Sequence, residues 1–294
     1  MSGTESSTFR RVLKLRERNR RTLGPVSNEH YTKRFYERLR NGATRSAEAI
    51  VPLVLQLVPI GSVVDVGCGD GTWLAVFRKL GVDEILGIDG EHVDLEILQI
   101  PRDSFKAFDL TKPFSLGRTF DLAVSLEVAE HLPADCAAVF VECLTRAAPF
   151  VLFSAAIPFQ GGEHHVNEQW PDKWATLFQK HGYVPVDFIR KRIWENDSVE
   201  RWYAQNTLLF AEASLLENNA ALKAEFEKTN PNQLCLVHPR QYLYLENQFR
   251  EAVARAQQPT LPSGVAAASR LLLVCLRNAF SKRVYSIIRK EPRP

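Results

Sequence analysis

Short apolar runs alternate with amphipathic segments through the middle of the chain. Seven of these runs have the length and hydrophobicity of β-strands, at residues 62–66, 84–89, 105–110, 120–126, 150–157, 183–190 and 207–213. Segments with a helical spacing of apolar side chains separate several of the runs, at residues 73–80, 134–147 and 170–180. Strands that alternate with helices predict βαβ units, and therefore an α/β fold with an open, doubly wound sheet.

The two ends of the chain have a different pattern, which suggests three parts. We expect a basic helical N-terminal extension at residues 1–44 and the α/β core at residues 45–214. A helical C-terminal extension would follow at residues 215–294, ending in a basic amphipathic helix. One stripe of that last helix would carry Leu273, Leu276, Phe280, Val284 and Ile287.

The distribution of charged residues follows the same division into two extensions and a core. The chain has a formal net charge of +3, but residues 10–40 hold eleven Lys or Arg against three acidic residues. Residues 269–294 hold seven against one, so the core is acidic. An acidic core offers no continuous groove for a polyanion, and we do not expect nucleic acid as a partner. The last helix would instead pack on the core, mediate self-association or lie on an anionic membrane surface as a peripheral contact.

Other features suggest the compartment. No apolar stretch reaches the roughly 18 residues that a membrane-spanning helix needs. The chain has five cysteines without a C-x-x-C pair, and its first residues lack the apolar segment of a secretory signal. We therefore expect a cytoplasmic protein with free thiols.

A glycine-rich loop, DVGCGDG, connects the first predicted strand to the helix after it, at residues 65–71. Its three glycines permit a tight turn and let backbone N–H groups approach a ligand. Asp89 ends the next strand, where a carboxylate can accept hydrogen bonds from ribose hydroxyls. The loop lacks the G-x-G-x-x-G spacing of dinucleotide sites. The carboxylate of Asp65 would repel a pyrophosphate and attract a ligand that carries an ammonium or sulfonium group.

The motifs VVDVGCGDGTW, LGID and FDLAVSLEVAEHLP, taken with the order of the elements, resemble those of class I S-adenosylmethionine-dependent methyltransferases. The resemblance covers about residues 45–214 and implies a Rossmann-like, seven-stranded sheet whose last strand is antiparallel. It implies S-adenosyl-L-methionine as the cofactor and S-adenosyl-L-homocysteine as its product.

The same resemblance implies which residues bind the cofactor. Asp65 and the glycine loop would hold the methionyl part, Asp89 the ribose, and Asp109 the adenine amino group, and Gly90 also belongs to the predicted cofactor-binding set. Asp65 would otherwise be a turn cap and Asp109 an ordinary surface residue. The remaining members of the set are Gly67, Cys68, Gly69 and Gly71 in the loop, Leu110 beside the adenine, and Ser125 and Leu126 on the methyl side.

Two polar segments follow the fourth and fifth predicted strands, where an acceptor would meet the methyl donor. The first contains Glu130 and His131, and the second, at residues 161–171, contains His165. Histidine has a reference pKa of about 6.5, so an imidazole here can take a proton from a hydroxyl group near neutral pH. We predict Glu130, His131 and His165 as catalytic residues. The alternative is that Glu130 and His131 cap the following helix or brace the loop.

Three further runs, HVNEQWP, WYAQN and SAEAIVP, resemble a bacterial group of small-molecule methyltransferases. These enzymes often accompany glycan or secondary-metabolite pathways. The resemblance therefore implies O-methylation of a small hydroxylated substrate, such as a sugar, by positioning and general-base catalysis.

Two other hypotheses stay open. Glu127, Glu130, His131 and His165 also resemble the metal-binding set of small-RNA 2′-O-methyltransferases, which would hold Mg²⁺ or Mn²⁺. We do not expect a metal, because the E-x-x-E-H pattern is also widespread in metal-free relatives. The third hypothesis is a non-catalytic assembly module, and the intact glycine loop and Asp89 argue against it.

Overall fold

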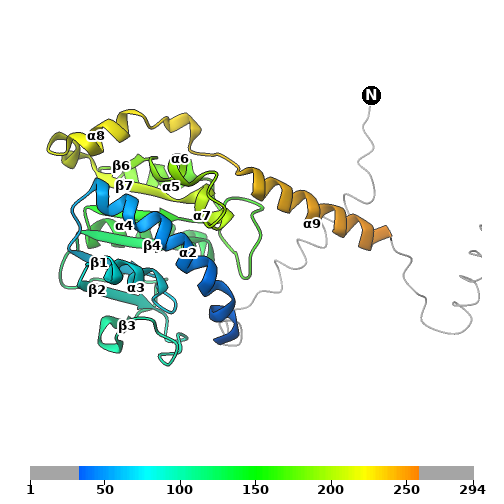
Figure 1. Cartoon of the computed structure of the whole chain (residues 1–294), viewed down its shortest axis with the longest axis horizontal. Coiled ribbons are helices and arrows are strands. Elements are labelled where there is room, and N and C mark those ends of the chain that lie inside the picture. The colour runs from blue at the N-terminus through cyan, green and yellow to red at the C-terminus, as the bar shows by residue number, and fades with distance from the viewer. Residues whose placement is uncertain (1–32, 258–294) are drawn as a thin grey trace, which may run out of the picture. The chain divides into compact units, whose positions relative to one another are not determined.

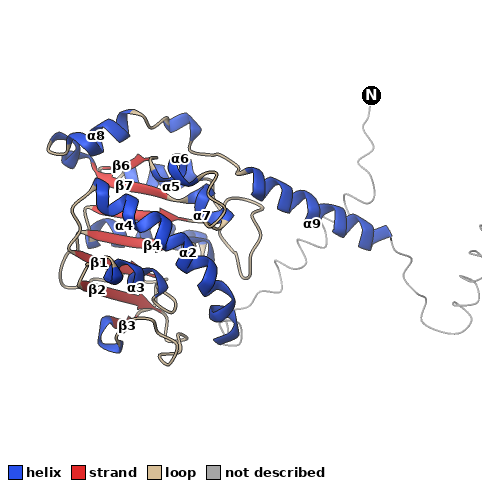
Figure 2. Cartoon of the chain, in the orientation of Figure 1, coloured by secondary structure: helices blue, strands red, loops and turns tan. Residues whose placement is uncertain are grey.

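The computed structural model describes residues 33–257 (Figures 1 and 2). The chain separates into two units, one of residues 17–247 and one of residues 1–16 with 248–294. The sheet and all the sites described below lie in the first unit. Of the second unit, the structure describes residues 248–257, which continue helix α9 (Pro239–Gln257) to its end.

The first unit contains a seven-stranded sheet with the strand order β3-β2-β1-β4-β5-β7-β6. Strand β7 is antiparallel to both of its neighbours, and the other neighbouring strands are parallel. This confirms the predicted Rossmann-like fold with its antiparallel last strand. The strands are β1 (Ser62–Val66), β2 (Glu84–Asp89), β3 (Phe105–Ala107), β4 (Leu122–Leu126), β5 (Phe150–Ser154), β6 (Tyr183–Val186) and β7 (Leu208–Glu212).

Helices cover both faces of the sheet, as Figure 2 shows. One hydrophobic cluster contains side chains of α2, α3, α6, α7 and α8, and the other contains side chains of α4 and α5. The helices are α2 (Lys33–Leu57), α3 (Thr72–Lys79), α4 (Ala137–Ala147), α5 (Pro171–Gln179), α6 (Ile189–Ile193), α7 (Arg201–Asn206) and α8 (Ala220–Glu227), followed by α9.

The strands explain the continuous apolar runs of the sequence. Every residue of β1, β4 and β5 is buried. Successive side chains point to opposite faces, so Val63 joins one cluster and Val64 the other. A sheet covered by helices on both faces needs apolar residues at nearly every strand position.

The order of the strands in the sheet determines where a ligand can bind. Strand β2 lies on one side of β1 and β4 lies on the other, so the strand order reverses direction at β1. Ligands of open α/β sheets bind at such a switch point, outside the carboxyl ends of the strands. The loops after β1, β2, β4 and β5 are therefore the candidate ligand-binding loops.

Several predicted elements differ in extent. The predicted strand at residues 183–190 is wrong beyond Val186, because Asp187 and Arg190 form an i, i+3 ion pair and α6 begins at Ile189. The predicted strands at residues 105–110 and 150–157 are shorter, and end at Ala107 and Ser154.

Helix α2 runs without interruption across the predicted boundary between residues 44 and 45. The division into three domains stays a prediction, and the predicted final helix with its stripe from Leu273 to Ile287 lies outside the described residues. Among the helices of residues 33–257, none combines the length and the hydrophobicity of a membrane-spanning segment.

Candidate active site

The glycine loop between β1 and α3 has a backbone that only glycine adopts without strain. Gly67 and Gly71 have φ angles of 86° and 78°, in the left-handed region. A Cβ atom on Gly67 would overlap the side chain of Val128, and one on Gly71 would come within 2.8 Å of Ile100. The loop is therefore closely surrounded by other side chains, and the backbone N–H groups of Gly67 and Gly71 donate to backbone carbonyls within the protein.

Asp89, at the end of β2, fixes the shape of this loop. Its carboxylate accepts hydrogen bonds from the backbone N–H groups of Gly69 and Gly90, both at 2.7 Å, and lies 3.6 Å from the ring of His92. Burial raises the pKa of Asp89, and the two N–H groups and His92 oppose the rise. Each carboxylate oxygen has a second lone pair, so the predicted contact with a ribose hydroxyl is compatible with these bonds.

Carboxylates gather around the loop. Asp65, in β1, is 3% exposed, and burial, Asp89 and Asp70 together raise its pKa well above the usual range. Asp70 binds Thr72 at the start of α3 and accepts a hydrogen bond at 2.7 Å from Arg40 of α2. A cationic group next to Asp65 would lower the cost of its buried charge, which suits a sulfonium or ammonium ligand.

Residues predicted to contact the adenine and the methyl group lie in two different environments. Asp109 is exposed, and its carboxylate binds Lys112 at 2.8 Å and Thr111 at 2.6 Å, which hold its pKa at about 2. This is the surface-turn geometry that we gave as its alternative. Leu110 and Leu126 are buried, and the buried Ser125 hydroxyl has no hydrogen-bond partner among the residues that the structure describes. The cofactor contacts of these residues stay predictions.

Glu127 begins the loop after β4 in the left-handed region, with φ of 57°. Its carboxylate accepts hydrogen bonds from the side-chain amides of Gln160, at 2.9 Å, and Asn206, at 3.1 Å. Gln205 binds both amides in turn, and Gln241 of α9 donates to the backbone of Gln160. A buried amide network, rather than a cation, therefore holds this carboxylate in place.

The structure brings the three predicted catalytic residues together. The His131 and His165 rings meet edge to face at 4.9 Å, and Nε2 of His165 lies 4.0 Å from Oε1 of Glu130. Backbone N–H groups of Val166 and Asn167 donate to the carbonyl of Glu130, so the loop after β5 is folded onto the loop after β4. Ligand atoms of Glu130, His131 and His165 all lie within 4.8 Å of one another, an arrangement that can also hold a metal ion.

Burial changes the protonation of this cluster. Glu130 is fully buried, and burial followed by the neighbouring carboxylate of Glu127 raises its pKa well above the usual range. Burial, followed by the adjacent His165, lowers the pKa of His131 to about 3. His131 is therefore a neutral imidazole at neutral pH.

One functional candidate was missed in the sequence. Glu168 binds Nδ1 of His165 at 3.2 Å and also accepts the backbone N–H groups of Phe159 and Gly161. Burial opposes ionisation of Glu168, but its hydrogen bonds with His165 and these N–H groups outweigh it and lower the pKa. The sequence feature that could have identified Glu168 is its position in the run HVNEQWP, three residues after His165. Asn206, in the run WYAQN, could have been identified in the same way.

With this geometry in place, the class of protein follows. The sequence profile of a family described as "Methyltransferase domain" matches residues 25–197. This match includes the glycine loop, Asp89 and the histidine cluster, which consists of Glu130, His131 and His165. The chain belongs to this family and is a class I S-adenosylmethionine-dependent methyltransferase. Its cofactor is S-adenosyl-L-methionine, and the glycine loop and the acidic surroundings of Asp65 fit that cationic ligand. The Ser125 hydroxyl, which has no partner within residues 33–257, is a polar group that the ligand can satisfy.

Solved structures with a similar chain trace include three methyltransferases. The sugar N-methyltransferase KedS8 from Streptoalloteichus sp ATCC 53650 is 15% identical, with a TM-score of 0.49 over 72% of this chain and 98% of that one. Magnesium protoporphyrin IX methyltransferase ChlM from Synechocystis PCC 6803 is 19% identical, with a TM-score of 0.41 over 60% and 87%. The methyltransferase domain of bacterial CtHen1 is 21% identical, with a TM-score of 0.40 over 57% and 97%. No curated protein sequence matches the chain.

Proposed function

We propose that this methyltransferase O-methylates a small hydroxylated compound of the sugar or secondary-metabolite class. The observation that carries the proposal is the contact between Glu168 and His165, which holds an imidazole beside His131 and Glu130. These residues follow β4 and β5, and β4 is the direct neighbour of β1 with its glycine loop. An acceptor bound there would lie between the methyl donor and a base.

His165 is the residue that we expect to take the proton of the acceptor hydroxyl. We assign its Nδ1 proton to the contact with Glu168, since a carboxylate can only accept, so Nε2 carries the lone pair that would take the proton. A carboxylate partner also stabilises the imidazolium that forms when Nε2 is protonated. His131, with its pKa of about 3, is too weak a base for this step and would orient the hydroxyl as a hydrogen-bond acceptor.

The donor half of the site has the separate task of holding the cofactor. Asp89 would bind the ribose, the backbone of the loop at residues 67–71 would surround the methionyl part, and Asp65 would face the positive charge. When bound, S-adenosyl-L-methionine supplies a methyl group that is already activated by its sulfonium. The protein then needs to exclude water, align the hydroxyl and remove its proton.

The test separates the base from the cofactor site. In a methyl-transfer assay against a panel of sugars and other hydroxyl compounds, His165→Ala should lower kcat by about 10²–10⁴-fold. Its affinity for S-adenosyl-L-homocysteine, measured by calorimetry, should stay within about twofold of wild type, because His165 is not part of the glycine loop. His181→Ala, at an exposed histidine after α5, is the matched control and should change neither value.

Two results would contradict the proposal. Full activity of His165→Ala with the true acceptor would remove the base assignment. A methylated nitrogen in the product, located by mass spectrometry and NMR, would replace O-methylation by N-methylation.

A second candidate function is a metal-assisted reaction such as RNA 2′-O-methylation. Its support is the close approach of the ligand atoms of Glu130, His131 and His165. Glu127, the fourth residue of the predicted metal set, is bound by two amides and does not belong to this group. Loss of turnover in EDTA, recovery with Mn²⁺ and methylation of RNA would favour this candidate, and EDTA-resistant turnover of a small molecule would exclude it.

A further inference from the structure

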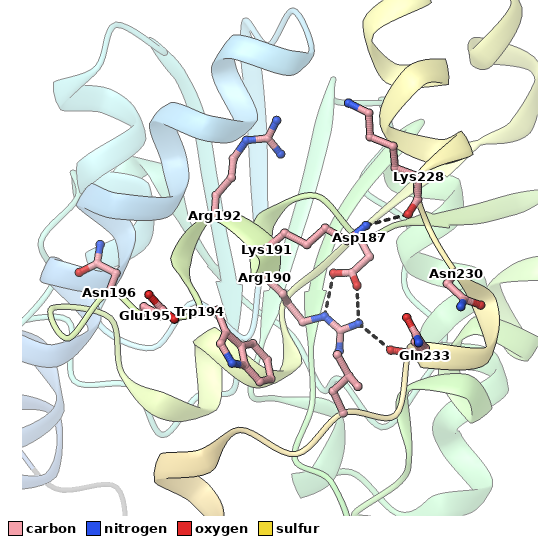
Figure 3. Close-up of a pocket in the computed structure, with 11 residues that line it drawn as sticks. Asp187, Arg190, Lys191, Arg192, Trp194, Glu195, Asn196, Lys228, Asn230 and Gln233 are labelled. Atoms are coloured by element: carbon pink, nitrogen blue, oxygen red, sulfur yellow. Dashed lines mark hydrogen bonds and ion pairs between the residues drawn. The ribbon is translucent and has the colours of Figure 1, made fainter.

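A cavity lies beside α6, outside the candidate active site (Figure 3). Its volume is about 560 Å³, within the range of small-molecule sites in proteins. Residues 187–196 line one side, and residues 228–236, after α8, line the other. None of the glycine-loop or histidine-cluster residues lines it, so the cavity is separate from the predicted methyl-transfer site.

The floor of the cavity is fixed by a buried ion pair. Arg190 is 1% exposed, and its Nε and Nη2 atoms bind the two carboxylate oxygens of Asp187 at 2.8 and 2.7 Å. Nη2 also binds the backbone carbonyl of Gln233 (Figure 3), and Nη1 binds those of Gln205 and Leu234. These partners occupy the guanidinium, so Arg190 shapes the cavity and leaves ligand binding to its neighbours.

Three further cations, Lys191, Arg192 and Lys228, line the cavity from two directions. Arg192 and Lys228 share the single carboxylate of Glu225, at 2.9 and 3.2 Å. Lys191 donates to the backbone carbonyl of Lys228 at 2.7 Å, which does not neutralise its charge. With the exposed carboxylate of Glu195 included, these five side chains leave one positive charge in excess.

The rest of the lining suits an organic group. The indole of Trp194 lies 4.5 Å from the ring of His238 and also lines the cavity, next to the floor in Figure 3. Asn230 and Gln233 add side-chain amides that can donate hydrogen bonds. A bare inorganic ion would fill only a small part of this volume.

We propose that this cavity binds a small organic molecule that carries a phosphate group. Lys191, Arg192 and Lys228 would contact the phosphate, and Trp194 would pack against the remainder of the molecule. A phosphate has more acceptor oxygens than a carboxylate and can therefore contact cations from both lining segments at once. The site is independent of which acceptor the enzyme methylates.

Inorganic pyrophosphate is the probe for the charged part of this site. We would titrate it into the full-length protein at low salt by calorimetry and compare the double variant Lys191→Met/Lys228→Met with wild type. The double variant should bind at least about tenfold more weakly, because it removes two of the three cations that would contact the phosphate. Lys223→Met, on the exposed surface of α8 outside the cavity lining, is the matched control and should bind like wild type.

Two readouts keep the result interpretable. Lys191→Arg retains the charge and should retain binding, and unchanged affinity for S-adenosyl-L-homocysteine shows that each variant is folded and that the donor site is separate. The proposal is overturned if wild type does not bind pyrophosphate, or if the double variant binds it as tightly as wild type, which would place the anion elsewhere on the chain.

Discussion

The donor half of the candidate site is built from residues close together in the sequence, whereas the acceptor half is built from residues far apart. In the donor half, the loop at residues 65–71 is held by Asp89 of the neighbouring strand through backbone hydrogen bonds. In the acceptor half, Glu127 depends on Gln160 and Asn206, which are 33 and 79 positions away, and the ring of His131 contacts that of His165. One half is held together by backbone hydrogen bonds, and the other by contacts between side chains.

This difference has a chemical consequence. The donor half, as proposed, holds a cofactor whose structure is the same whichever acceptor is methylated. Side chains on loops can be exchanged without disturbing the strands, so the acceptor can change while the donor site remains. Substitutions in the two halves should therefore separate cofactor binding from turnover.

The largest expected effect comes from Gly67→Ala in the donor half. The new methyl group would overlap Val128 and force an L-residue into a φ of 86°. We expect S-adenosyl-L-homocysteine affinity to fall by at least about 100-fold, with a loss of stability of about 2–4 kcal/mol, because strain and overlap add.

Gly182→Ala is the matched control for that experiment. Its φ is 79°, but nothing lies within 4 Å of its added Cβ, so it carries the strain without the overlap. It should lose only about 1–2 kcal/mol and keep its cofactor affinity. Equal behaviour of the two variants in thermal melting and calorimetry would show that the close contact with Val128 has no role.

The next effect tests the acceptor half through Glu168→Gln. The amide keeps the size of the side chain but removes the charge that stabilises a protonated His165, so kcat should fall by about 10–100-fold. Cofactor affinity should stay at the wild-type value. The pH–rate profile distinguishes the two roles of Glu168: loss of a charge that takes part in proton transfer should change the profile, whereas loss of a brace should lower the rate equally at every pH. An unshifted profile would reduce Glu168 to a structural role.

The sequence predicted the strand–turn–helix of the glycine loop well because its constraints are local. A strand, a turn that needs left-handed glycines and an acid at the end of the next strand leave a pattern within about 25 residues. The seven strands could be predicted for a similar reason, because strands covered on both faces appear in the sequence as continuous apolar runs. Strand ends were less predictable: the ion pair of Asp187 with Arg190 started α6 inside a segment that reads as a strand.

The acceptor half was predicted only as a set of residue types. His131 and His165 lie 34 positions apart, and only the folding of the second loop onto the carbonyl of Glu130 brings them into contact. The link from Asn206 to Glu127 spans 79 positions. Contacts of this kind depend on how the loops pack against each other. The periodicity of apolar residues and the spacing of motifs do not predict that packing. Helix α2 shows the same limit, because Arg40 reaches Asp70 from a segment that we placed outside the core.

The smallest effect that we predict is a difference in pH dependence between His131 and Glu130. Unfolded, His131 takes up a proton near pH 6.5, but in the folded protein its pKa is about 3. The unfolded state therefore binds more protons between these values, and the stability from neutral His131 is present above pH 6.5 and is lost as the pH falls toward 3. Lowering the pH from 7 to 5 should reduce the free energy of unfolding by about 1 kcal/mol through His131. The reduction is smaller than the full pKa shift would give, because the ring is not wholly removed from water.

His131→Gln should remove that cost, so its melting temperature should fall about 2–4 °C less than that of wild type between pH 7 and pH 5. Glu130→Gln should have the opposite effect. The raised pKa of Glu130 means that the folded state binds the extra proton, so its contribution is present below the unfolded pKa and is lost as the pH rises. Removing this carboxyl group should make the fall in melting temperature between pH 7 and pH 5 larger than in wild type. Shifts of the same sign in the two variants would mean that these buried groups do not titrate separately in the acceptor half.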